Sequence, residues 1–291
     1  MRSMHHRRMV SLLSVLAGLV CAAPVTAKVH VVATIFPLAD IVQQIGTDNV
    51  EVTTLLPPGA SPHMFEPTPS QIRALAQADL LVRVGAGLDN WTDKLSAARR
   101  SDLRVITVSD NITLRSAAGT VGDPHVWLDP ILVRDHLVPA LAAALGHTDA
   151  AHTAAFERAA GEFRAALTAL DAEIRKILAP FSNRNYIAFH SAWGYFGQRY
   201  GLRESAAVEP SPGKEPSAQE IRHVIEQARS AGIQALLVEP QFPARLAEQI
   251  ARDFNGHTVL VDPLGGAAVP GRDHYLQLMR YNAQMFAQAL Q

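Results

Sequence analysis

Three histidines and one aspartate are the residues of this sequence best suited to chemistry, because each lies beside prolines or at the end of an apolar run. His63 lies in "LLPPGASPHMFEPTPSQ", a stretch with five prolines, and His125 lies in "GDPHVWLDP". His190 ends the run "NYIAFH", and Asp262 follows "VLV". Proline fixes φ and removes an amide donor, so a proline-rich loop holds a side chain in one place.

Imidazole nitrogens and a carboxylate oxygen form a ligand set that suits tetrahedral Zn²⁺, with metal–ligand distances of about 2.0–2.2 Å. The other histidines beyond residue 27 lie in polar helical patterns, caps or strand starts, where we expect no metal ligand: His30, His136, His147, His152, His223, His257 and His274. The sequence has one cysteine, Cys21, so a metal site in the rest of the chain must use nitrogen and oxygen.

The first 27 residues have the features of a secretory signal peptide. A basic start precedes an apolar run, 9–21, and small residues lead to Ala27. The run is too short to span a bilayer, so we expect cleavage after Ala27, with lipidation of Cys21 as the alternative. Cleavage removes three of the 26 basic residues and none of the 27 acids, which leaves a net charge of about −4. This charge disfavours a nucleic-acid partner.

Beyond residue 28 the chain alternates short apolar runs with helical patterns. We expect strands at 29–36, 50–56, 80–84, 103–108, 186–189, 235–238 and 258–261. This alternation is typical of βα units around a parallel sheet. In open α/β sheets ligands bind beyond the carboxyl ends of the strands. The four candidate residues lie at or near such ends, two in each half of the chain, so they can converge if the halves face each other.

A stretch without proline, Asp149 to Leu178, separates the two groups of strands. Its apolar residues recur at intervals of four and three, as on one face of a single helix, which would be about 45 Å long. We therefore expect two parallel-sheet βα lobes, 28–148 and 180–291, joined by one rigid helix over 149–179. The metal site would lie in the cleft between the lobes.

Several segments resemble the zinc- and manganese-binding solute receptors of bacterial ABC importers, the cluster A-I family. They are "GASPHMFEPTPSQ", "VGAGLDNWTDKL", "DPHVWLDP", "FHSAWGYFGQRYGL", "LLVEPQF" and "VDPLG", and they occur in order over nearly all of the chain beyond the signal. The resemblance implies two lobes joined by a long helix, with His63, His125, His190 and Asp262 as metal ligands. It also implies a periplasmic receptor that delivers one metal ion per chain to an inner-membrane ABC permease.

Two departures from the family pattern bear on the metal. Many zinc members carry a histidine-rich loop between the first two ligands, whereas "NITLRSAAGTVGDP" contains no histidine. Manganese members usually have two histidines, a glutamate and an aspartate, and this sequence has His190 where they have the glutamate. Three imidazoles suit Zn²⁺ better than the harder Mn²⁺. We expect a monomeric zinc receptor, with the same role for Mn²⁺ as the alternative and a periplasmic metallochaperone as a further candidate partner.

A secreted zinc hydrolase is the alternative from another class of protein. Such an enzyme needs an open coordination position for water and a nearby general base. Four protein ligands leave no such position, and the sequence has no H-E-x-x-H motif. Glu66 and Glu239 are the carboxylates near the motifs that could act as a base. Glu239 is also the alternative to Asp262 as fourth ligand, since "LLVEPQF" ends a strand too. We expect no enzymatic activity.

Overall fold

The computed structural model describes residues 27–95, 101–116, 122–210 and 213–291. The predicted signal segment and Cys21 lie outside the described residues. Among the helices of the described part, none is long and apolar enough to cross a membrane.

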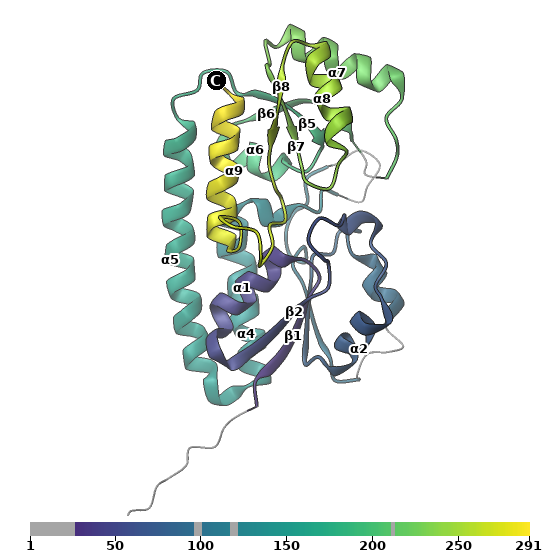
Figure 1. Ribbon diagram of the computed structural model, residues 1–291. Helices are drawn as coiled ribbons and strands as arrows, with labels where there is room; N and C mark the ends of the chain where they lie inside the picture. Colours follow the sequence, from purple (N-terminus) through teal and green to yellow (C-terminus); the bar gives the residue numbers. More distant parts are fainter. Residues whose placement is uncertain (1–26, 96–100, 117–121, 211–212) are drawn as a thin grey trace, which may run out of the picture.

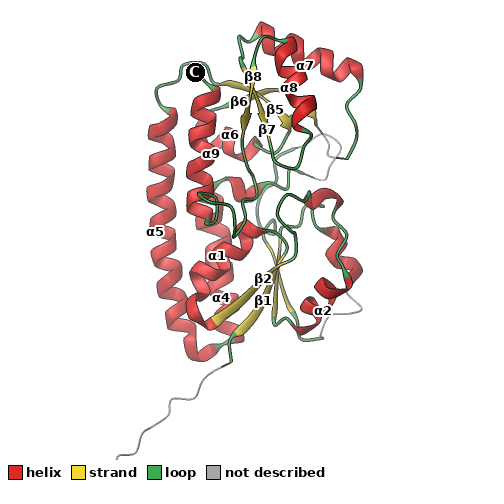
Figure 2. Ribbon diagram, viewed as in Figure 1, coloured by secondary structure: helices red, strands yellow, loops and turns green. Residues whose placement is uncertain are grey.

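Two four-stranded parallel sheets form the framework of the molecule (Figures 1 and 2). The first sheet contains, in spatial order, β2 (Val50–Thr54), β1 (Val29–Ala33), β3 (Leu80–Arg83) and β4 (Arg104–Thr107). The second contains β6 (Arg203–Glu209), β5 (Asn185–His190), β7 (Ala235–Val238) and β8 (His257–Leu260). Every neighbouring pair is parallel, which confirms the predicted fold class.

Strand β6 was not among the predicted strands. Its sequence, "RESAAVE", begins and ends with charged residues, and most of its side chains are only half-buried. The strand lies at the edge of its sheet, where it pairs with β5 alone. Edge strands often carry charged side chains that discourage pairing with other chains, so an apolar run is a poor guide to them.

Helices connect the strands and cover the sheets. The α-helices besides the long one are α1 (Phe36–Gly46), α2 (Pro69–Gln77), α3 (Pro130–Leu132), α4 (Val138–Thr148), α6 (Gly194–Tyr200), α7 (Ala218–Ser230), α8 (Ala244–Asp253) and α9 (Tyr275–Ala289). Short 3₁₀ turns lie at η1 (Thr47–Asn49), η2 (Pro62–Met64), η3 (Asn90–Leu95), η4 (Val126–Leu128) and η6 (Ala150–His152), and η5 (Val133–Leu137) is a π-helical segment.

The long helix α5 (Thr153–Leu178) has 26 residues and is therefore about 39 Å long. It runs along one side of the molecule past both lobes (Figure 1). The predicted apolar stripe is buried, with Phe156, Leu167 and Ile174 fully covered. The helix begins later than predicted, because Ala150–His152 forms a separate 3₁₀ turn before it. The residue limits of the two lobes stay predictions.

A second connection between the lobes comes from α9, which lies beside α5 (Figure 1). At its start, the Tyr275 amide donates to Asp40 in α1 (2.7 Å), and the Tyr275 hydroxyl donates to the carbonyl oxygen of Trp127 (2.6 Å). The main apolar core is continuous from side chains such as Ile41 to Phe286. The two sheets are therefore held by two helices and a shared core.

We expect metal binding to change the overall shape very little, because a helix packed along both lobes resists a wide hinge motion. Small-angle scattering with and without metal should give nearly equal radii of gyration. A large decrease in the radius on binding would contradict this expectation.

Candidate metal centre

Three of the four predicted ligands lie together between the two sheets. One ring nitrogen from each of His63, His125 and His190 lies within 4.8 Å of the other two. The ring centroids are 5.1–5.4 Å apart. His63 Nε2 is buried and has no hydrogen-bond partner in the part of the chain that the structure describes. A buried nitrogen without a partner, facing two further imidazoles, fits a metal ligand.

His63 is held by the segment between β2 and α2. The segment is not all loop, as the sequence suggested, because Pro62–Met64 forms a 3₁₀ turn and α2 already begins at Pro69. Proline is well tolerated at the first position of a helix, where no amide donor is needed. The Gln71 side chain donates to the Leu55 carbonyl oxygen (2.5 Å) and accepts from the Thr68 amide (2.7 Å). These bonds tie both ends of the segment together.

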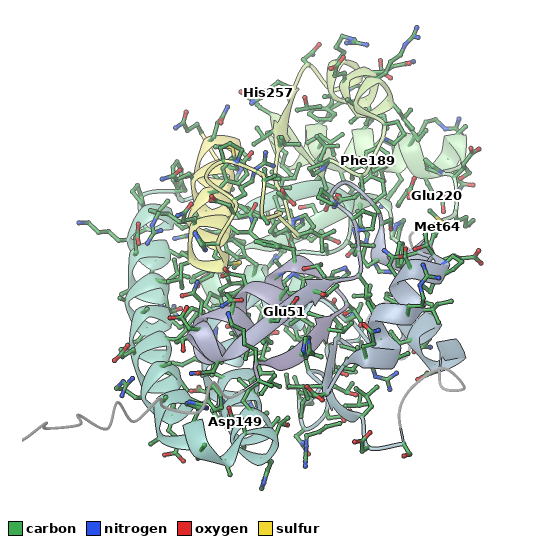
Figure 3. All side chains as sticks on the ribbon, turned by 60° about the horizontal axis from the view of Figure 1, so that its bottom comes forward. Glu51, Met64, Asp149, Phe189, Glu220 and His257 are labelled. Atoms are coloured by element: carbon green, nitrogen blue, oxygen red, sulfur yellow. The ribbon has the colours of Figure 1, made fainter. Side chains whose placement is uncertain are left out.

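The residue after His63 is at the molecular surface. Met64 is 64% exposed, and in Figure 3 it is labelled on the side of the molecule where Glu220 of α7 also lies. The segment that carries the first histidine thus extends from the buried site to solvent.

His125 is held by Asp123, a residue that the sequence analysis did not select. The Asp123 Oδ1 atom lies 2.8 Å from His125 Nδ1 and accepts the His125 backbone amide at 3.0 Å. Both side chains are buried. A carboxylate oxygen can accept a hydrogen bond from Nδ1–H, and in that tautomer Nε2 is free for a metal. An aspartate two residues before the histidine, as in "DPH", is the pattern of an Asx turn and was the available signal.

His190 ends β5 and is buried beside Glu239. The His190 Nδ1 atom lies 3.8 Å from Glu239 Oε1, which also accepts a hydrogen bond from Trp193 Nε1 (3.0 Å). Glu239 Oε2 has no hydrogen-bond partner among the described residues. Burial raises the pKa of the Glu239 carboxyl well above its usual value, which favours the neutral form of the group.

Asp262 is not a member of the group of nitrogen and oxygen atoms within 4.8 Å. Its Oδ1 accepts the backbone amides of Leu264 (3.0 Å) and Gly265 (2.9 Å), and its Oδ2 is 2.9 Å from Arg272 Nη1. Both oxygens therefore have partners inside the protein. Glu66 is exposed at the surface and is not in the group either.

The cavity beside the three imidazoles is small and largely apolar. Its volume is about 20 Å³, and Trp127, Phe242 and Leu264 contribute to its walls. Space of this size holds one water molecule or one ion. Trp127 and Trp193 are fully buried. The arrangement suits one metal ion enclosed by nitrogen ligands and apolar side chains.

Burial keeps the imidazoles of His63 and His190 uncharged. Burial, with a smaller contribution from the nearby His125 ring, lowers the pKa of His63 to about 3. Burial also moves the pKa of His190 well below its usual value, with His125 and His63 acting in the same direction. Metals bind neutral imidazole, so His63 and His190 need lose no proton at pH 7 before a metal binds.

Comparison with known proteins identifies relatives over almost the whole chain. The family model described as "ZnuA: Zinc-uptake complex component A periplasmic" matches residues 31–289. A putative metal-binding protein of Thermotoga maritima is 30% identical over 263 residues, covering 89% of this chain and 92% of its own. The high-affinity zinc uptake system protein ZnuA of Bacillus subtilis is 26% identical over 281 residues, covering 90% and 88%.

Solved structures have the same architecture. A crystal structure of ZnuA matches with a TM-score of 0.83 at 32% identity, covering 91% of this chain and 100% of the other. A Mn-bound periplasmic metal binding protein from Candidatus Liberibacter asiaticus also gives 0.83, at 21% identity, with 91% and 100% covered. At that identity the likeness shows the fold alone.

The depressed pKa values predict that the metal-free protein loses stability in acid. Below about pH 6.5 the unfolded chain binds protons at His63 and His190 while the folded chain does not, so stability falls as the pH falls towards 3. Each histidine contributes a slope of at most about 1.4 kcal/mol per pH unit. Urea unfolding in the presence of a chelator at pH 7, 6 and 5 measures this slope.

His63→Gln should flatten the pH dependence, and His257→Gln, at an exposed position, should leave it unchanged. Equal slopes for the parent and His63→Gln would contradict the assignment of a buried, neutral imidazole.

Proposed function

The chain belongs to the ZnuA family of periplasmic metal-binding receptors, and from this premise we propose that it captures Zn²⁺ and delivers it to an ABC permease for import. The family consists of transport proteins, not enzymes, which excludes the hydrolase alternative. The observation that carries the proposal is the convergence of three imidazoles on a cavity of one-ion size. The periplasm as location and the inner-membrane permease as partner are part of the same proposal.

The choice of zinc follows from the chemistry of the ligands. Imidazole is a borderline-soft donor that suits Zn²⁺, whereas Mn²⁺ favours carboxylate, carbonyl and water oxygens. Here the three converging donors are all nitrogens. The Bacillus subtilis relative is named for zinc uptake, and the Mn-bound structure with the same fold makes Mn²⁺ the alternative cargo.

His63, His125 and His190 are the proposed ligands, with Asp262 as the fourth. Asp262 follows the carboxyl end of β8, and His190 ends the parallel strand β5, so both lie at the same ends of the strands. The adjoining Pro263 and Leu264 line the cavity. To bind the ion, its carboxylate must turn from Arg272 or share an oxygen. Glu239 is the alternative, because its Oε1 lies near His190 and its Oε2 has no partner among the described residues.

The first test concerns the identity of the metal. Purified protein should bind one Zn²⁺ per chain and prefer it to Mn²⁺ by orders of magnitude, because all three imidazoles are softer donors than carboxylates. Elemental analysis and competition titration measure both quantities. His190→Glu, which restores the residue usual in manganese members, should reduce the preference for zinc. Manganese displacing zinc at equal concentration would overturn the proposal.

The second test concerns the fourth ligand. Asp262→Asn should weaken zinc binding by about 10–100-fold, since even the loss of an outer partner of a ligand has such effects. Glu239→Gln should have a smaller effect, and Arg272→Gln should leave binding unchanged or stronger because it frees the Asp262 carboxylate. Isothermal titration compares the three variants. If Glu239→Gln loses zinc while Asp262→Asn binds like the parent, Glu239 is the fourth ligand.

A further inference from the structure

Asp123 contacts both a proposed ligand and the opposite lobe. Its Oδ1 atom holds His125 through the ring nitrogen and the backbone amide. Its carbonyl oxygen accepts the Tyr195 hydroxyl at 3.1 Å, and Tyr195 belongs to α6, directly after His190 in the second lobe. Asp123 therefore connects His125 to α6, the helix that follows His190.

Arg115 reinforces this contact from the far end of the segment 115–123. The Asp123 amide donates to the Arg115 carbonyl oxygen at 2.8 Å, and Arg115 Nε lies 3.7 Å from Asp123 Oδ2. The Arg115 amide donates to the Tyr195 hydroxyl (3.1 Å), and its guanidinium group binds Gln198 of α6. The Arg115–Asp123 pair is thus held against α6 at several points.

Gly194 makes the close approach possible. A Cβ atom added at Gly194 would lie 2.7 Å from Asp123 Oδ2 and 2.9 Å from Arg115 Nε. Real Cβ contacts are essentially never shorter than 3.0 Å. The Asp123 side chain is short and fixed by His125, so it cannot move away without releasing the imidazole. Glycine at this position therefore leaves room for the carboxylate.

We propose that Asp123, seated against Gly194 and Tyr195 of the opposite lobe, is the positioning residue that keeps His125 protonated at Nδ1 and presents Nε2 to the metal. A neutral imidazole carries its proton on either nitrogen, and only the nitrogen without the proton can bind a metal. The Asp123 carboxylate stabilises the competent tautomer and fixes the plane of the ring. The inference rests on the proposed role of His125 as a ligand.

Because Asp123 packs against α6, the orientation of the His125 ring depends on how the two lobes are placed relative to each other. The backbone around His125 belongs to the first lobe, yet the group that orients the ring is packed on α6 of the second. A displacement of α6 should therefore move Asp123 and, through its 2.8 Å hydrogen bond to His125, change the orientation of that ring.

The tautomer of His125 in the metal-free protein is the direct readout. Long-range ¹H–¹⁵N NMR should detect the proton on Nδ1 in the parent and a shift towards Nε2 in Asp123→Ala. Zinc affinity of Asp123→Ala should fall by about 10–100-fold. Asp123→Asn, which keeps an acceptor oxygen, should recover part of both the tautomer and the affinity. A merely structural role for Asp123 would change the unfolding temperature without changing the tautomer.

Asp129→Ala is the matched control. Asp129 is also buried and also joins the lobes, through Arg199 of α6 at 2.8–2.9 Å, but it contacts none of the three histidines. This variant should be less stable and yet keep the parent tautomer at His125. Loss of the tautomer in Asp129→Ala would mean that lobe docking in general, not Asp123, orients the ring, and would overturn the proposal.

Gly194→Ala tests the packing of Asp123 against α6 without altering any polar side chain. It should weaken zinc binding by about tenfold or more, whereas Gly161→Ala in α5, where an added Cβ meets nothing within 4 Å, should leave binding unchanged. If His125→Ala binds zinc like the parent, the proposed ligand set is wrong. If His125→Ala loses zinc while Asp123→Ala and Gly194→Ala keep parent affinity and tautomer, the positioning role is wrong.

Discussion

The whole arrangement depends on bringing one ring nitrogen from each of three imidazoles within 4.8 Å of the other two in a largely apolar environment. Three protonated rings could not occupy this space, because like charges at about 5 Å repel strongly where water is excluded. Burial solves the problem by lowering the pKa values of His63 and His190, so the nitrogens keep their lone pairs. The same burial that favours metal binding therefore carries a stability penalty in acid, when no metal is present.

Such a site cannot be built by one lobe alone. His63 and His125 come from the first lobe, and His190 comes from the second. A geometry that spans two sheets requires their relative position to be fixed, which explains why α5, α9 and a continuous core connect them. The hydrogen bonds of Tyr275 to Asp40 and to Trp127 add a rigid polar link close to the ligand segments. Rigidity between the lobes is thus part of the metal site.

The three histidines could be recognised from the sequence because proline context and strand ends are local features. The sequence could not reveal which other residues these side chains and their neighbours contact in the folded protein. Asp123 meets α6 only because segments far apart in the sequence are brought together, and the turn that pairs Arg272 with Asp262 has no apolar or proline pattern that predicts the pair. Strand β6 was missed for a related reason, since its place at a sheet edge removes the need for an apolar run. The sequence therefore indicated which residues could bind a metal, but not their tertiary contacts or the position of each strand in its sheet.

Three acidic residues surround the imidazoles, and each is in a different electrostatic state. Burial raises the pKa of Glu239, the charge of Asp262 is balanced by Arg272, and Asp123 is hydrogen-bonded to His125. An incoming cation therefore meets the uncharged rings of His63 and His190, while the Asp123 and Asp262 carboxylates already have partners inside the protein. Hard ions such as Mg²⁺ and Mn²⁺ rely on anionic oxygens, which is the physical basis of the zinc preference that we propose. This environment also limits long-range attraction, so most of the affinity must come from short metal–nitrogen bonds. Such bonds weaken steeply when one ring turns, which suits a receptor that must later give up its ion.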